Sequence, residues 1–343
     1  MNEPILGWDV GGANIKAALV GGTAAEPRVV ERGFPLWREP HRLGSVLVET
    51  AATFGGPTPS MAVTMTAELA DCFETKRDGV ASVLGAFKSA FPGIEPWVYG
   101  VDGRFRSPAA AHRDPMDVAA ANWMAAASLV AGIYPSALFV DVGSTTVDII
   151  PIAGGRVAAQ GRDDPSRLQA GELVYTGLLR TPICAVVRSA PLRGKPCRVA
   201  AEHFAIAADV HRWRGHIDEA DYTCDTPDSR GRSRRDAGAR LARVVCADLE
   251  MLDDSDVTAI AAHVARAQVR QIAVAIRQVT RRSGVRGTGP AVVAGRGAFL
   301  AREAAEALGL DTVHLADRLG AGAAQAVPAA AVALLLGAAL KER

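Results

Sequence analysis

Two segments of the chain carry residue types that bind phosphate groups and metal ions. Residues 7–16 read GWDVGGANIK, and residues 139–148 read FVDVGSTTVD. Each runs from an apolar stretch into Asp-x-Gly and a small residue, and then into a second alternating stretch. A glycine without Cβ lets backbone N–H groups approach phosphate oxygens, and Mg²⁺ binds carboxylates while keeping several waters. The pattern therefore predicts a grip on a di- or triphosphate with Mg²⁺.

Specific roles follow from the residue types in these two loops. Asp9 and Asp141 are predicted to hold Mg²⁺, and Lys16 supplies a point charge to a phosphate. Asp148 alternates with Val147 and faces either the cleft or the other strand of its hairpin. The predicted phosphate-binding residues of the two loops are Gly11, Gly12, Asn14, Gly143, Ser144, Thr145 and Thr146.

A single Asp-Gly turn would indicate little, because Asp and Gly dominate ordinary tight turns for conformational reasons. Here the second Asp follows the first after 132 residues (141 − 9). A third turn, Gly295-Arg296-Gly297, follows another apolar stretch. The three turns together favour a phosphate site over three unrelated hairpins.

The elements around the two loops also repeat. Strands are predicted over 4–10, 13–20 and 27–34 in the first half, and over 137–141, 145–152 and 156–161 in the second. Further predicted strands are 61–66, 96–101, 290–294 and 313–315, and predicted helices are 44–54, 79–90, 118–130 and 298–308. The shared order indicates an internal duplication.

Gly and Pro between 132 and 136 mark the expected domain boundary. We expect a first domain over 1–134 and a second over 135–324. The second contains a mostly helical insert at about 200–283 and the Gly-rich turn at 295–297. The Ala-rich segment 325–343 is expected to form a helix that packs back on the first domain.

Composition excludes several classes of protein. Hydrophobic residues make up 49% of the chain, charged residues 22%, and the formal net charge is +1. This balance argues against a general nucleic-acid binder. Five cysteines without a C-x-x-C pair indicate neither a zinc site nor a disulfide framework. Segment 321–340 is apolar, but Pro328 interrupts it and Ala and Gly dominate it, so we expect a cytoplasmic protein without a membrane span.

The three turns resemble the phosphate-1, phosphate-2 and adenosine motifs of the acetate kinase, sugar kinase, Hsp70 and actin superfamily. This resemblance implies an α/β fold of two duplicated ribonuclease-H-like, actin-like ATPase domains with a central cleft. Gly295, Arg296 and Gly297 would then contact the ligand. Arg296 is bulkier than the residue expected against a purine, which favours a ligand other than adenine, although Arg can also stack on adenine.

Three segments carry a closer resemblance: residues 7–14 (GWDVGGAN), 64–73 (TMTAELADCF) and 172–177 (ELVYTG) with Arg180-Thr181-Pro182. They resemble the hydantoinase-like proteins linked to tetrahydromethanopterin one-carbon pathways, whose archaeal members are methanofuran-biosynthesis synthases. The match extends from residue 5 to about 300.

That resemblance implies a transferase of methanofuran or methylofuran assembly. It joins [5-(aminomethyl)furan-3-yl]methyl diphosphate to the phenol oxygen of a tyramine or tyrosine derivative and releases diphosphate. The partners are therefore two small molecules, the furfuryl diphosphate and the phenolic acceptor. Mg²⁺ and Lys16 would stabilise charge on the departing diphosphate. Asp148, Glu68 and Asp141 are alternative acceptors of the phenol proton.

Other functions and roles stay open at this stage. The same loops suit an ATP-dependent phosphotransferase or ATPase, and also a nucleotide-gated scaffold without chemistry. Glu68 either takes part in catalysis or caps the next helix. Glu172 and Tyr175, with Arg180, either line the acceptor pocket or begin a helix. Six arginines between 230 and 243 form either a solvated face or a recognition site for the acceptor's carboxylates.

Overall fold

The computed structural model describes residues 3–21, 26–56, 60–283 and 289–341. Its first half is built on a six-stranded sheet with the order β3-β2-β1-β4-β5-β6. The strands are β1 (Ile5–Val10), β2 (Asn14–Val20), β3 (Arg28–Gly33), β4 (Ser60–Met65), β5 (Trp97–Tyr99) and β6 (Phe105–Arg106). The helices of this half are α1 (Leu43–Ala52), α2 (Lys76–Ala90), α3 (Pro108–Arg113) and α4 (Asn122–Ile133), with short 3-10 turns at Pro40–Arg42, Ala67–Leu69 and Pro115–Asp117.

The second half repeats the central part of this sheet. Its strand order is β10-β8-β7-β13-β14, with β9 paired to β8. The strands are β7 (Ala137–Val142), β8 (Val147–Ala153), β9 (Arg156–Val157), β10 (Leu173–Val174), β13 (Ala291–Ala294) and β14 (Thr312–His314). In both sheets the central strand pairs antiparallel with its hairpin partner and parallel with a later strand. The predicted α/β fold with two duplicated actin-like sheets is therefore confirmed.

Two predicted elements differ from the observed ones. The helix expected over 118–130 begins only at Asn122, because Ala120 adopts a left-handed φ of 51° that interrupts the helical path. The strand expected over 156–161 ends at Val157. Beyond it, the backbone N–H groups of Gln160 and Gly161 donate to the Glu172 carboxylate at 2.7 and 3.0 Å instead of to a neighbouring strand.

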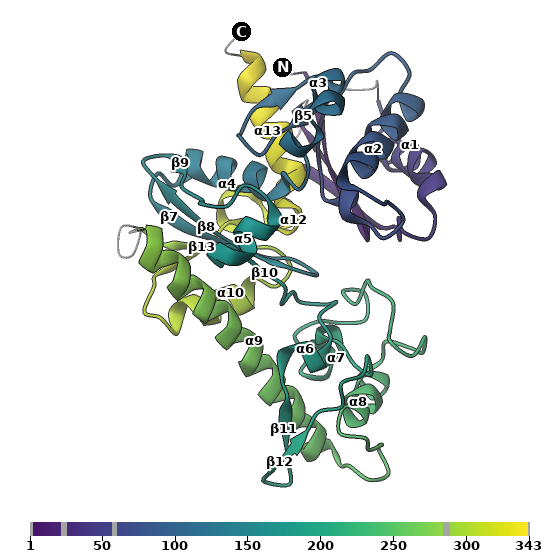
Figure 1. The fold of residues 1–343 in the computed structure, drawn as a ribbon, viewed down its shortest axis with the longest axis vertical. Coiled ribbons are helices and arrows are strands. Elements are labelled where there is room, and N and C mark those ends of the chain that lie inside the picture. The colour runs from purple at the N-terminus through teal and green to yellow at the C-terminus, as the bar shows by residue number, and fades with distance from the viewer. Residues whose placement is uncertain (1–2, 22–25, 57–59, 284–288, 342–343) are drawn as a thin grey trace.

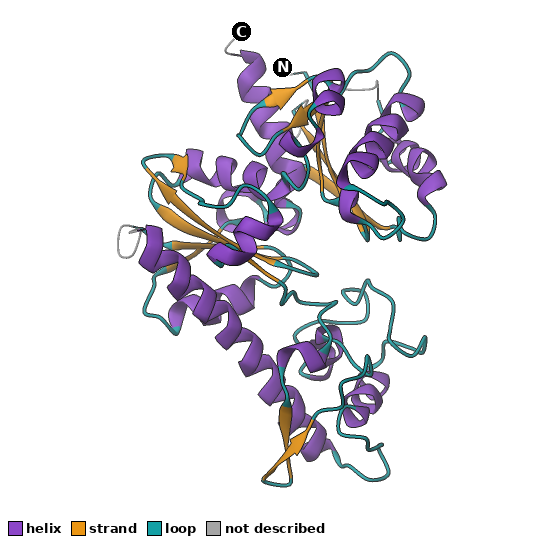
Figure 2. Cartoon of the chain, in the orientation of Figure 1, coloured by secondary structure: helices purple, strands orange, loops and turns teal. Residues whose placement is uncertain are grey.

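A further lobe lies beyond the second sheet, and the long helix α9 (Asp254–Ser283) runs from that sheet into it (Figures 1 and 2). The lobe contains α6 (Ile183–Val186), α7 (Ala207–Trp213), α8 (Arg234–Arg243), β11 (Ser189–Leu192) and β12 (Lys195–Arg198). Two more helices, α5 (Asp164–Ala170) and α10 (Ala298–Glu306), flank the second sheet.

The arginines of segment 230–243 do not form a single solvated face. Arg240 is fully buried, and its guanidinium donates to Asp209 at 2.8 Å and to Asp228 at 3.0 Å. The Tyr222 hydroxyl donates to the same Asp209 carboxylate at 2.9 Å. This network fixes the irregular chain between α7 and α8, so at least Arg240 has a structural role rather than one in recognising a ligand.

The C-terminal helix α13 (Val327–Lys341) packs against β1, β2 and α4, following the short helices α11 (Ala316–Leu319) and α12 (Ala321–Gln325). Residues 342 and 343 of the expected helix lie outside the described residues. The contact with β1 is very close, because a Cβ on Gly7 would lie 2.1 Å from the carbonyl oxygen of Ala329. Within the described ranges, no helix combines the length and apolarity that a membrane crossing requires.

Gly7→Ala is expected to destabilise the protein strongly, because the added methyl group collides with backbone that cannot move without separating α13 from β1. Overpacking of this kind costs about 1–3 kcal/mol or more. Chemical denaturation measures the effect. Gly85→Ala is the control, since Gly85 is an exposed residue of α2 with open space at its Cβ position, and Ala there should stabilise the helix by about 0.5–1 kcal/mol. Equal stability of Gly7→Ala and the wild type would contradict the close contact.

Candidate active site

The two Asp-Gly loops are hairpins of the same geometry. The Gly11 N–H donates to the Asn14 carbonyl at 3.0 Å, and the Gly143 N–H donates to the Thr146 carbonyl at 2.9 Å. In β1 and β2, Asp9 lies opposite Lys16. In β7 and β8, Asp141 lies opposite Asp148. Lys16 and Asp148 therefore hold equivalent positions, with a cation in one half and an anion in the other.

The third turn comes directly against the second loop. Gly295 has a φ of +83°, and a Cβ on it would lie 2.2 Å from Asp141 Oδ1. The Gly297 N–H donates to the carbonyl of Val142 at 2.9 Å. Arg296, expected to contact the ligand, forms an ion pair with Glu31 of β3 at 2.8 Å. This arginine thus links the two halves, and only the glycines approach the loop.

Asp9 is buried and Asp141 is half-buried, and desolvation is the main cause of the raised pKa values of both carboxyls. The pKa of Asp9 rises to about 6 and that of Asp141 to about 7. Asp148 raises both values further, and Lys16 lowers both. These shared influences show that the four predicted groups form one charged cluster between the halves. Because Arg167 pairs with Asp148 at 2.6 Å, the carboxyls of Asp9 and Asp141 share the ammonium of Lys16, so a further cation would stabilise the cluster when both are ionised.

The donor set fits Mg²⁺. Asp9 Oδ1 is buried and accepts no hydrogen bond in the described structure. Over the same residues, no three His, Cys, Asp or Glu side chains are grouped as a metal site would require. The protein would therefore supply the two carboxylates of Asp9 and Asp141. Mg²⁺ suits such a sparse set, because it keeps several waters and binds substrate phosphates.

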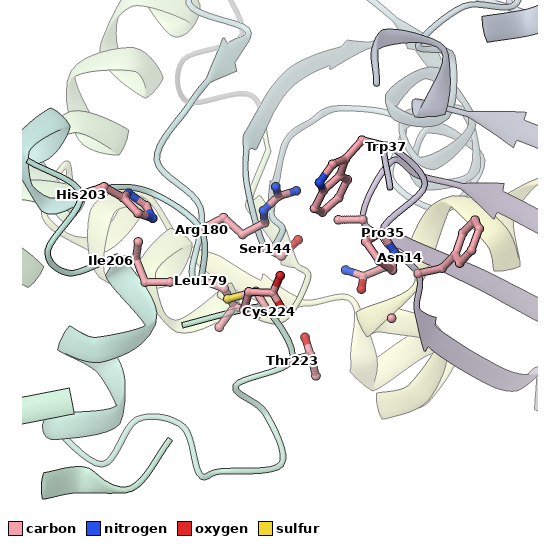
Figure 3. A pocket seen from close by; sticks show the side chains of 14 residues that line it. Asn14, Pro35, Trp37, Ser144, Leu179, Arg180, His203, Ile206, Thr223 and Cys224 are labelled. Carbon is pink, nitrogen blue, oxygen red and sulfur yellow. The ribbon is translucent and has the colours of Figure 1, made fainter. Parts of the chain in front are cut away.

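A pocket of about 320 Å³ adjoins both loops. In Figure 3, Trp37 and Arg180 point toward each other from opposite halves, with Ser144 and Asn14 beside them. Predicted residues of both loops thus contribute to one pocket that also has apolar walls. Its lining consists of Ala13, Asn14, Gly33, Phe34, Pro35, Trp37, Ser144, Leu179, Arg180, His203, Ile206, Thr223, Cys224 and Asp225.

The segment that follows β10 is hydrogen-bonded to the backbone of the second loop. The Gly177 N–H donates to the carbonyl of Thr145 at 3.0 Å, and the Leu178 N–H donates to that of Gly143 at 2.9 Å. A Cβ on Gly177 would lie 2.4 Å from the carbonyl carbon of Thr145. Gly177 therefore allows a backbone contact that no other residue type would permit.

Two residues expected in the acceptor pocket lie elsewhere. Glu172 is buried and accepts the two backbone N–H groups after β9, which is a structural role. Tyr175 is 54% exposed and borders a separate groove between α9 and β10. Arg180, the third residue of that expectation, does line the pocket.

Three charged residues of the site were missing from the sequence-based prediction. Arg167 is buried over the Trp123 ring and donates to Asp148 at 2.6 Å, so Asp148 is already paired. Lys76 of α2 lies 2.7 Å from Asp164 of α5 and 3.8 Å from Glu68. No motif marks these residues. The signal in the sequence is limited to a charged residue at the start of two helices, Lys76 in α2 and Asp164 in α5, which have opposite signs.

Glu68 is the least solvated carboxyl of this group. It is 1% exposed, and burial raises its pKa to about 7 despite nearby backbone N–H groups and Lys76. The Cβ position of Gly79 lies 2.4 Å from the Glu68 Cα, so α2 closes over it. It does not border the 320 Å³ pocket.

Glu68→Gln is expected to stabilise the protein at pH 8 and to leave its stability unchanged near pH 4. Because the pKa is raised from 4.5 to about 7 in the folded state, the stability linked to the protonated carboxyl is present below pH 4.5 and lost as the pH rises through 7. The neutral amide removes that loss, worth roughly 3 kcal/mol. Urea unfolding at both pH values measures it, with exposed Glu95→Gln as the control. A shift of the same size at both pH values would contradict the burial of a titrating group.

Comparison with known proteins shows that the chain is similar in sequence to one family and to two of its named relatives. Residues 60–335 match the hydantoinase/oxoprolinase family. The (4-{4-[2-(gamma-L-glutamylamino)ethyl]phenoxymethyl}furan-2-yl)methanamine synthase of Methanocaldococcus jannaschii is 34% identical over 337 residues, which cover 98% of each chain. The protein of the same name from Methanococcus vannielii is 31% identical over 208 residues, covering 60% of this chain and 92% of that one.

A solved structure of nucleotide-free acetone carboxylase shares the fold. It aligns with a TM-score of 0.57 and 11% sequence identity, covering 96% of this chain and 70% of that one. At this identity the likeness shows the fold alone.

Proposed function

The chain belongs to the hydantoinase/oxoprolinase family, and from this premise we propose that it is a synthase of methanofuran or methylofuran assembly that joins a furan to a phenol through an ether. The observation that carries the proposal is the 34% identity to the M. jannaschii synthase over 98% of both chains. The name of that relative describes a phenoxymethyl group on a furan that also bears a methanamine arm. The bond made by such an enzyme lies between a phenol oxygen and a furan-bound CH₂ carbon.

The proposed donor is [5-(aminomethyl)furan-3-yl]methyl diphosphate, and the acceptor is a tyramine or tyrosine derivative. The carbon–oxygen bond of the donor breaks, and its electron pair leaves with diphosphate. The phenol oxygen bonds to the same carbon, and the phenol proton passes to a base. Because the furan ring delocalises the positive charge that develops on the reacting carbon toward the ring oxygen, ionisation of the donor precedes or accompanies attack.

The charged cluster suits this reaction. Lys16 would bind the diphosphate electrostatically, and the backbone N–H groups of the two hairpins would orient it. Asp9 and Asp141 would hold Mg²⁺, which supplies Lewis-acid stabilisation of the leaving diphosphate when bound. The second loop adds the hydroxyl groups of Ser144, Thr145 and Thr146. The adjoining pocket would hold the acceptor and keep water from the furfuryl carbon.

Glu68 is the proposed base because the other two candidates are engaged elsewhere. Its pKa of about 7 lies near the working pH, which favours proton transfer. Asp148 is paired with Arg167 at 2.6 Å, and Asp141 is assigned to the metal. Because Glu68 does not border the pocket, the phenol proton would reach it through intervening groups.

The alternative is an ATP-dependent phosphotransferase. It is favoured by the meeting of all three turns in the same cleft, with Gly295 against Asp141. An ATP-dependent enzyme would use the same carboxylates and Lys16. The adenine of ATP would then lie near the third turn.

Incubation of the purified protein with furfuryl diphosphate, γ-glutamyltyramine and Mg²⁺ tests the proposal. We expect the aryl ether, detected by mass, and free diphosphate in a ratio of one to one without ATP. Absence of ether together with acceptor-dependent consumption of ATP would overturn the transferase and favour the alternative.

A further inference from the structure

Arg180 is a cation of the pocket without an anionic partner. In the part of the chain that the structure describes, no carboxylate lies within 4 Å of its guanidinium. Its nearest defined contact is the Trp37 ring, whose centroid lies 5.2 Å from the guanidinium carbon. Arg38, whose guanidinium carbon lies 5.9 Å from the centroid of the same ring, differs because it pairs with Asp225 at 3.1 Å.

The backbone and the aromatic ring fix where Arg180 can act. Its N–H donates to the Ser144 carbonyl at 3.0 Å, which ties the residue to the second loop. Trp37 follows β3 in the other half of the molecule. Figure 3 shows the guanidinium directed toward the indole across the pocket. Stacking on the ring face leaves the N–H groups in the guanidinium plane available to a ligand.

A planar guanidinium held in this way is suited to a carboxylate, which accepts two parallel N–H bonds. The pocket that it borders also has apolar walls from Phe34, Leu179 and Ile206. These walls suit the hydrocarbon and ring of an amphipathic ligand. The charge and the walls together match a phenolic amine whose far end carries an amino-acid carboxylate.

We propose that Arg180, held by Trp37, is the receptor for the carboxylate of the acceptor and so selects a glutamylated tyramine over free tyramine. The proposal rests on the transferase function proposed above, and it names the acceptor class of that same site. The diphosphate of the donor is the other oxyanion available. We assign the diphosphate of the donor instead to Lys16 and to the backbone N–H groups of the two hairpins. These groups lie beside the carboxyls of Asp9 and Asp141.

The test compares Arg180→Gln with the wild type using γ-glutamyltyramine and tyramine as acceptors. We expect KM for γ-glutamyltyramine to rise about 10- to 100-fold, because a hydrogen-bonded charged pair is lost. KM for the donor should stay within about twofold, and the preference in kcat/KM for γ-glutamyltyramine over tyramine should fall by the same 10- to 100-fold. Trp37→Leu should give a smaller rise for γ-glutamyltyramine alone, and Trp37→Phe should restore part of it. Arg235→Gln is the control, since it removes the charge of an exposed arginine on α8 that does not line the pocket.

Calorimetric binding of γ-glutamyltyramine without donor separates this proposal from the proposed function. If Arg180→Gln binds γ-glutamyltyramine at least tenfold more weakly than the wild type does, the result supports Arg180 as the carboxylate receptor even when no ether is made. An increase in donor KM with acceptor binding intact would show that Arg180 binds diphosphate and would overturn the proposal. Equal binding by the wild type and by Arg180→Gln, with an unchanged unfolding temperature, would overturn it as well.

Discussion

Asp141→Asn is expected to reduce kcat by about a thousandfold, since stabilisation of transition-state charge is typically worth that much. The same variant is expected to make the ligand-free protein more stable at pH 8. The Asp141 carboxyl is half-buried near Asp9, Asp148 and Lys16, and desolvation raises its pKa from 3.8 to about 7. Its charge is thus unfavourable in the free protein and is used only when a cation and a diphosphate are bound. The amide is nearly isosteric, so the fold should persist.

The sign of the stability change follows from the raised pKa. The contribution of the protonated carboxyl is complete below about pH 3.8 and is lost as the pH rises through about 7. At pH 8 the neutral amide should therefore add on the order of 4 kcal/mol, and at pH 4 almost nothing. Turnover assays and urea unfolding at both pH values measure the two effects on one variant.

Controls separate catalysis from folding. Asp9→Asn should show the same pair of effects, with a stability gain that is smaller because its pKa rises only to about 6. Asp311→Asn changes an exposed carboxyl before β14 and should alter neither quantity. Full turnover by Asp141→Asn would show that this carboxylate is not needed for the chemistry and would contradict its proposed role.

Lys16→Met is expected to lower kcat by about 100- to 1,000-fold, the usual loss when one preorganised charge-stabilising group is removed from an active site. Lys16 lies opposite Asp9 on β2 and acts on both carboxyls. Methionine keeps the length and apolar stem but not the charge. Steady-state kinetics with varied donor, together with binding of inorganic diphosphate, measure the effect.

Lys88→Met is the matched variant for this test, because Lys88 is exposed on α2 and far along the chain from the loops. It should leave kcat and diphosphate binding unchanged. A Lys16→Met enzyme that binds diphosphate as tightly as the wild type would show that the ammonium serves only to balance Asp9. That result would assign the diphosphate to another part of the cleft.

The repeated loops could be predicted from the sequence because their chemistry is local. Asp-x-Gly, the hairpin strands and the following small residues are contiguous, and the repeat after 132 residues (141 − 9) gives the pattern its weight. The duplicated sheets follow from the same repeat. The Gly295 turn was also predictable, since only a glycine allows a φ of +83° against Asp141.

The partners of the charged residues could not be predicted, because they come from distant elements. Arg296 pairs with Glu31 across 265 residues, and Lys76 pairs with Asp164 across 88. Each pair depends on how the two halves meet. Glu172 was misplaced for a related reason: its segment packs on the second loop through Gly177, while its own side chain turns away to hold the backbone after β9.

An incubation with acceptor carrying ¹⁸O in its phenol group, together with furfuryl diphosphate, Mg²⁺ and ATP, tests the central claim most directly. If the enzyme transfers the furfuryl group, the label appears wholly in the aryl ether, the released diphosphate is unlabelled, and ATP is unchanged. Label in an aryl phosphate, with ATP consumed and no ether formed, would contradict the proposed transfer.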